Sequence, residues 1–178
     1  MTMALSVVYA DRTGHVLGAL ALTGASAPTD VAALVGPELP IRVSLGANRT
    51  AILPVDAREL AAAAVDDEPG ALAEPLAFGV ERGSDKEPKP TLLSLPQWTD
   101  GLALKPDDLT ITLPLPTTAS APVVVLVADD QDTHVLVGEI PGGRTQVKLP
   151  VALTAGTTYG LLVLVAGWAG RLERVKVA

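Results

Sequence analysis

Several residue types are missing or scarce in this sequence. The chain has no cysteine, which excludes disulfides, thiolate metal ligands and cysteine nucleophiles and suits a reducing compartment. Aromatic residues make up 3% of the 178 residues, so there are few platforms on which bases or sugar rings could stack. Only 13 Lys and Arg stand against 20 Asp and Glu, and the net charge of −7 repels phosphate backbones and anionic lipid. We therefore expect neither nucleic acid nor a membrane surface as a partner.

Long apolar runs are missing as well. The most apolar stretch, residues 160–168, is far shorter than the roughly 20 residues of a spanning helix, and we expect a buried strand there. The apolar region 5–22 is interrupted by Asp11, Arg12 and His15, so we interpret it as mature protein rather than a signal peptide. The apolar residues are mainly Ala, Val and Leu, which predicts an aliphatic core. The Ala-rich, Lys-poor composition is typical of a GC-rich bacterial source.

Two segments have the layout of a β-hairpin. Residues 7–10 and 15–20 are apolar and flank the polar turn 11–14, which contains a glycine. Residues 123–128 and 134–140 flank the acidic turn 129–133 in the same way. In both, the second strand begins with His-Val-Leu. Leu-Pro-Val also occurs in both halves, at 53–55 and 149–151, so we suggest an internal duplication, with about 20 extra residues in the first half.

Three shorter segments of the first half carry predictions. Residues 31–35 are followed by Gly-Pro and are expected to form a short edge element, whereas residues 41–45 alternate like a half-buried strand before a turn at 46–48. Residues 56–65 have good helix propensity, with Asp56 as a candidate cap. The duplication instead predicts a strand over 60–65 and a turn at 67–70 leading into 72–80. We favour the strand.

The charged, proline-containing segment 82–90 is typical of an exposed connection. We therefore predict an N-terminal β domain over residues 1–82, a linker or strap over 83–104 and a C-terminal β-sandwich over 105–178. The short strands and frequent turns after residue 109, where 109–115 alternates, are typical of antiparallel sandwiches. The expected fold class is all-β, with two small tandem antiparallel β-sandwich domains of Ig-like type.

Residues 153–165 carry a Leu before a turn, then Gly-Thr, then Tyr159 opening an apolar strand. This segment resembles the penultimate strand of fibronectin type III modules, and with residues 168–177 the resemblance covers about 25 residues. The resemblance implies that Tyr159 ties its strand to the preceding loop. The Trp that this family usually carries in an early strand has no clear counterpart here.

The two histidines, His15 and His134, follow turns that contain Asp, which invites a metal or acid–base interpretation. A zinc site needs three or four converging ligands, and no ligand spacing is present, so we expect polar hairpin tips and no metal. The acidic runs 129–132 and 66–68 offer oxygen ligands for Ca²⁺ but lack the EF-hand pattern, and solvated turns are favoured.

Motifs for catalysis are also missing. The sequence has no nucleophile elbow and no phosphate-binding loop, and the Gly-rich residues 141–144 lack the required Lys-Ser/Thr. We therefore expect a protein that is not an enzyme, with no catalytic residues and no cofactor. Trp98 and Trp168 are the candidate partner contacts, although core anchors are the favoured interpretation because large aromatics are usually buried.

The expected function follows from shape rather than chemistry. Tandem β modules with strand edges commonly act as interaction scaffolds. We expect a structural or adaptor protein that self-associates or binds protein partners in a larger assembly, such as a phage-like or capsid-like particle component. Its expected location is the cytoplasm or a particle assembled there. The alternatives are a carbohydrate or small-ligand module that uses an exposed Trp and, ranked last, an enzyme using a histidine.

Overall fold

The computed structural model describes residues 3–82 and 89–178. Strands predominate and the helices are short, which confirms the all-β prediction. The first elements are β1 (Met3–Ala10), β2 (Val16–Thr23), α1 (Val31–Val35), β3 (Glu38–Gly46), β4 (Arg49–Asp56) and the 3-10 helix η1 (Ala57–Glu59). Next come β5 (Leu60–Val65), α2 (Pro69–Ala73), the 3-10 helix η2 (Pro75–Ala77), β6 (Phe78–Glu81), β7 (Thr91–Ser94) and β8 (Leu102–Leu104). The last are β9 (Asp108–Thr112), β10 (Ala121–Ala128), β11 (Thr133–Ile140), β12 (Gln146–Pro150), β13 (Thr158–Val165) and β14 (Arg171–Lys176).

Contacts within the chain define two compact units, each drawn from separate segments. Unit 1 comprises Met1–Leu39, Val55–Gln97 and Gly167–Ala169. Unit 2 comprises Pro40–Pro54, Trp98–Ala166 and Gly170–Ala178. Most of the β3–β4 hairpin therefore belongs to unit 2, although it lies in the first half of the sequence. The domain boundaries at residues 82 and 105 stay predictions, and residues 83–88 of the predicted linker lie outside the described residues.

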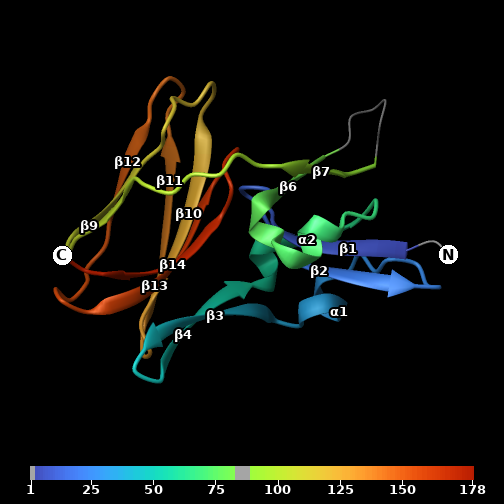
Figure 1. Cartoon of the computed structure of the whole chain (residues 1–178), viewed down its shortest axis with the longest axis horizontal. Coiled ribbons are helices and arrows are strands. Elements are labelled where there is room, and N and C mark those ends of the chain that lie inside the picture. The colour runs from blue at the N-terminus through green and yellow to red at the C-terminus, as the bar shows by residue number, and fades with distance from the viewer. Residues whose placement is uncertain (1–2, 83–88) are drawn as a thin grey trace. The chain divides into compact units, whose positions relative to one another are not determined.

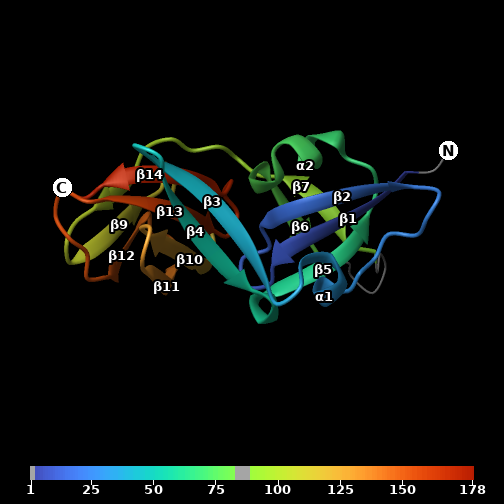
Figure 2. The ribbon, with the colours of Figure 1, turned by 90° about the horizontal axis from the view of Figure 1, so that it is seen from below.

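Unit 1 is built on a three-stranded antiparallel sheet in the order β2-β1-β5 (Figure 1 and Figure 2). The predicted first hairpin is confirmed: β1 pairs with β2, with a register irregularity between Val8 and Tyr9. One face of this sheet packs into an aliphatic core that includes Ala71 of α2. The buried members of that core are Leu5, Val7, Tyr9, Val16, Ala63, Val65 and Ala71.

The helix-or-strand question for residues 56–65 is resolved by pairing with β1. Asp56 accepts a hydrogen bond from the backbone N–H of Arg58 (2.8 Å) and caps only η1. Leu60–Val65 then forms β5, as we favoured, with Leu5 opposite Val65 and Ala10 opposite Leu60. Residues 61–64 are four consecutive alanines. Their advantage in helix propensity over strand formers is less than about 1 kcal/mol per residue, and pairing with β1 outweighs it.

Two segments of unit 1 differ from the predictions. Residues 31–35 form the helix α1 instead of an edge element, because Asp30 caps it by accepting from the N–H of Ala32 (3.3 Å). The strand expected over 72–80 is shorter. Residues 69–77 form α2 and η2, each beginning with a proline at its first turn, and only β6 is extended.

Unit 2 contains two antiparallel sheets, in the orders β11-β10-β13-β14 and β12-β9-β8 (Figure 1). The second predicted hairpin is confirmed, since β10 pairs with β11 from Ala121 opposite Ile140 to Ala128 opposite Thr133. The hydroxyl oxygen of Tyr159, at the start of β13, accepts a hydrogen bond from the N–H of Thr154 (3.2 Å). Tyr159 thus ties its strand to the preceding loop, as expected.

The β3–β4 hairpin packs on the four-stranded sheet of unit 2 (Figure 2). A Cβ placed on Gly160 of β13 would lie 3.1 Å from the Cβ of Val43 and 3.3 Å from that of Ala51. Gly160, Leu162 and Leu164 alternate with Leu161, Val163 and Val165 along β13, so they share this face, and Leu162 is fully buried. The two central strands, β10 and β13, pack against neighbours on both faces, and strands in that position lack polar alternation, which explains the apolar runs 121–128 and 160–165.

Candidate functional site

The two histidines occupy different environments. His15 is completely buried in unit 1, which corrects the expectation of a polar hairpin tip. Its Nε2 lies 2.6 Å from the carbonyl oxygen of Trp168, and its Nδ1 lies 2.8 Å from the hydroxyl of Thr13. Because a carbonyl can only accept, Nε2 carries the proton and Nδ1 accepts from Thr13. His134 lies on β11 of unit 2 and is half-buried.

Burial also sets the charge of His15. Removal from water disfavours the imidazolium and lowers the pKa from its ordinary 6.5 to about 4, although the hydrogen bond to the Trp168 carbonyl acts in the opposite direction. His15 is therefore neutral near pH 7. With both ring nitrogens bonded inside the fold and no exposed surface, the ring joins the turn Gly167–Ala169 to the β1–β2 hairpin.

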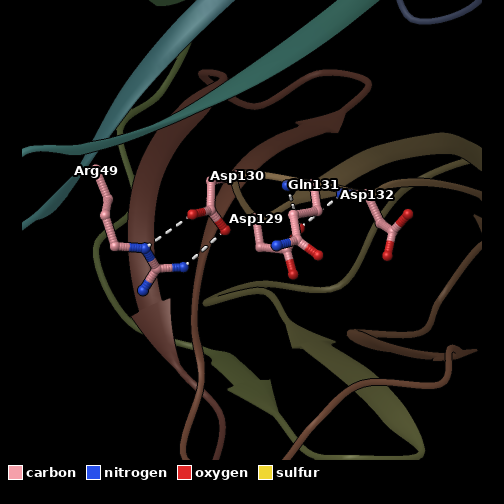
Figure 3. A network of polar contacts seen from close by, with 5 residues as sticks. All are labelled: Arg49, Asp129, Asp130, Gln131 and Asp132. Atoms are coloured by element: carbon pink, nitrogen blue, oxygen red, sulfur yellow. Dashed lines mark hydrogen bonds and ion pairs between the residues drawn. The ribbon is translucent and has the colours of Figure 1, made fainter.

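The acidic turn between β10 and β11 is held by its own hydrogen bonds (Figure 3). The Asp129 carboxylate accepts from the backbone N–H groups of Gln131 (2.8 Å) and Asp132 (2.7 Å). Asp130 receives two hydrogen bonds from the Arg49 guanidinium of β4 (3.1 and 2.9 Å), which lower the pKa of its carboxyl. Two of the three carboxylates thus have structural partners, and the favoured turn interpretation accounts for them.

The second acidic run has similar roles. Asp66 forms an ion pair with Lys89, and Glu68 caps α2 by accepting from the N–H of Gly70 (3.1 Å). Across residues 3–82 and 89–178, no group of three or more Asp, Glu or His side chains lies close enough to hold a metal ion.

Trp98 is only 4% exposed, and this burial favours the core-anchor interpretation. The guanidinium of Arg171 stacks on its ring at 4.4 Å from the centroid. The same guanidinium donates to the backbone carbonyls of Thr99 (2.7 Å) and Asp100 (3.1 Å), and it forms an ion pair with Glu173 (2.7 Å). Trp168 is half-buried, so it retains some surface for a partner.

Unit 1 carries a shallow apolar pocket of about 250 Å³ between β1, β2, α1 and β3. Val8, Leu20 and Leu34 are among its lining residues, and the side chain of Ser6 adds one hydroxyl group to the lining. That hydroxyl donates to the carbonyl of Pro28 (2.7 Å), so it is already satisfied within the fold. The lining side chains therefore present mainly hydrocarbon to a ligand.

The surface that the sequence analysis missed is strand β11. Val135 is 62% exposed and Val137 is 52% exposed. Both lie on the same sheet face as Leu126 and Val124 of β10, because Val135 pairs with Leu126 and Val137 pairs with Val124. The signal was present in the sequence: residues 133–140 contain a single charge, Glu139, although the strand lies at a sheet edge.

No protein-family model matches this sequence, and no curated protein resembles it closely enough to count as a relative. Within the part of the chain that the structure describes, no helix has the length and apolar character needed to cross a membrane.

Proposed function

We propose that this chain is a non-enzymatic structural or adaptor protein that packs into a larger protein assembly through its sandwich surfaces and strand edges. A component of a phage-like or capsid-like particle, assembled in the cytoplasm, is the kind of role that fits. The observation that carries the proposal is the pair of exposed valines, Val135 and Val137, on an edge strand of unit 2.

An edge strand exposes unpaired backbone N–H and C=O groups that can pair with another chain. Exposed apolar side chains on the same strand add buried area when such pairing occurs. β11 offers both features, and Leu172 on β14 adds a further exposed apolar residue, 39% accessible, to the same sheet. Together they favour protein partners over small ligands.

We also propose that unit 2 is an Ig-like module. Its strand order, with β11-β10-β13-β14 facing β12-β9-β8, matches two antiparallel sheets of a sandwich module. The hydrogen bond that Tyr159 accepts from the Thr154 N–H is the contact that a tyrosine corner makes. These features support a fibronectin type III-like module, and such modules are frequent in adaptor and scaffold proteins.

The alternative, a carbohydrate or small-ligand module, depends on an exposed Trp. Trp98 is covered by Arg171, so Trp168 is the residue on which this alternative rests. An unchanged glycan-array profile after Trp168→Ala would remove it.

The test is the size of the particle that contains the chain in the cells that make it. We expect a tagged full chain in a gentle lysate to elute from a sizing column well above the mass of one or two copies. The double variant Val135→Lys/Val137→Lys should shift to small sizes, whereas Leu115→Lys, at a loop residue that is 63% exposed, should not. Elution of the wild-type chain at the mass of a monomer would refute the proposal.

A further inference from the structure

Strand β11 has a free edge. It pairs on one side with β10, in a continuous register without a bulge over all eight residues. Among the described residues, no backbone hydrogen bond joins Thr133–Ile140 to any other segment. The outward N–H and C=O groups of an eight-residue strand are therefore available to another strand.

The strand also lacks the usual protection against pairing. Natural edge strands carry Lys, Pro, bulges or short lengths that discourage edge-to-edge contact. Strand β14, at the opposite edge of this sheet, has four charged residues among its six, and β12 carries Lys148 and Pro150. β11 contains neither Lys, Arg nor Pro, and its outward side chains include Val135 and Val137.

We propose, on the basis of the assembly function above, that β11 pairs antiparallel with β11 of a second copy of this chain, with the two-fold axis at Leu136. The two four-stranded sheets then form one continuous sheet. Because directly opposed residues share a face, the exposed valines of both copies lie on the same side.

The side chains select this register. With the axis at Leu136, Val135 of each copy faces Val137 of the other, and Glu139 faces Thr133. Moving the axis by one residue, to Val137 or to Val135, is less favourable. An axis at Val137 sets Val135 against Glu139, whereas an axis at Val135 sets Val137 against Thr133. Only the Leu136 axis pairs every exposed valine with another valine, which buries the most apolar area.

Charge supports a second copy as the occupant. The chain has a net charge of −7, so copies repel one another unless unlike charges meet locally. The antiparallel pairing brings the acidic turn 129–132 of each copy to the end of the strand where the other copy carries its 141–144 turn. Arg144 in that turn is exposed, and the acidic turn supplies the carboxylates of Asp129 and Asp132. The pairing therefore brings Arg144 of each copy toward the acidic turn of the other, and Glu139 is the remaining charge at that end.

The first test is the mass of the purified full chain by light scattering. We expect a dimer for the wild type and loss of the dimer in Val135→Lys and Val137→Lys, because each change places a charge in the apolar contact. Leu115→Lys is the matched control, since Leu115 is 63% exposed and Val135 is 62% exposed. Unchanged circular dichroism and melting temperature show that the variants fold. A monomeric wild type, or equal loss of the dimer in the control, would overturn the proposal.

The second test reads the register. The chain has no cysteine, so each introduced thiol is unique. A mixture of Val135→Cys and Val137→Cys chains should form a disulfide-linked dimer under mild oxidation, because opposed Cβ atoms lie about 4.5–5.5 Å apart. Each variant alone should cross-link far less, because its thiols are diagonal neighbours about 7–8 Å apart. Equal cross-linking in all three samples would contradict the register.

The two proposals can fail separately. A purified chain that stays monomeric while the chain in cells elutes in a large particle overturns self-pairing and leaves the assembly function standing. Elution at monomer mass in cells, with a dimer in the purified sample, overturns the assembly function instead.

Discussion

The β1–β2 hairpin of unit 1 and the β10–β11 hairpin of unit 2 have the same order of elements along the chain: strand, polar turn and strand. In both, a third strand pairs with the first strand on its other side, giving the orders β2-β1-β5 and β11-β10-β13. Their surroundings differ. In unit 2 the face that carries Leu162 is fully buried at that residue, whereas the corresponding face in unit 1 is buried at Val8 of β1 and leaves Leu20 of β2 44% exposed. A hairpin pattern thus specifies which strands pair, and the segments that later pack on them decide what is buried.

The largest expected difference in stability is between two leucines, Leu162 on β13 of unit 2 and Leu20 on β2 of unit 1. Leu162→Ala removes a fully buried side chain on the face next to the β3–β4 hairpin and should lower the free energy of unfolding by about 2–5 kcal/mol. Leu20→Ala should lower it by less than about 1 kcal/mol, because that side chain is partly in water. Urea denaturation followed by circular dichroism measures both. Equal effects would show that the two faces are equally buried in solution.

The buried His15 of unit 1 makes the stability of the protein depend on pH. Between pH 6.5 and 4 the unfolded chain binds a proton at His15 that the folded chain does not, because the folded pKa is about 4. The contribution of His15 to the free energy of unfolding is therefore complete above pH 6.5. About 3 kcal/mol of it is lost as the pH falls toward 4.

The measurement is the difference between wild type and His15→Gln in urea denaturation across this pH window. Wild type should lose more stability than the variant as the pH falls, since Gln does not titrate. Parallel curves for the two proteins would contradict a neutral, buried His15.

The glycines of the second strands form a matched pair. A Cβ on Gly138 of β11 would lie 2.5 Å from a methyl carbon of Leu149, so Gly138→Ala should destabilise by about 1–3 kcal/mol. Gly18 of β2 has no atom within 4 Å of such a Cβ, and Gly18→Ala should stabilise by about 0.5–1 kcal/mol. Thermal melts of the two variants give opposite shifts if the packing differs as described, and a shift of the same sign in both would break this part of the comparison.

The tyrosines give the smallest expected difference. Tyr159→Phe removes the hydrogen bond from the Thr154 N–H and should cost about 0.5–1.5 kcal/mol. Tyr9 lies in the unit 1 core, and within residues 3–82 and 89–178 its hydroxyl has no hydrogen-bond partner, so Tyr9→Phe should cost less. Guanidinium denaturation of both variants measures the difference, and a larger loss for Tyr9→Phe would count against the role of Tyr159 as a tie.

Much of the strand layout was predictable because it depends on local patterns. Apolar runs around polar turns located both hairpins, and the alternation over 41–45 located part of β3. Residues 31–35 were harder, since five residues with no clear period fit a helix or a strand, and the cap at Asp30 decided for α1. The internal duplication stays a prediction that the shared strand order is compatible with.

The candidate sites were less predictable. The burial of Trp98 agrees with the favoured core-anchor interpretation, because large aromatics are usually buried. The burial of His15 was not foreseen, since its partner, the Trp168 carbonyl, lies 153 positions away along the chain. Nothing local to residues 11–15 indicates that contact.

By itself, the sequence determined the all-β class, the two hairpins and the aliphatic cores, because backbone pairing and side-chain alternation act over a few neighbouring residues. Only the tertiary structure decided that the β3–β4 hairpin joins unit 2, that His15 is sealed from water and that Val135 and Val137 stay exposed on a free edge. Those outcomes depend on segments that are distant in sequence competing for the same faces, and the strand that no segment covers is the one left for a partner.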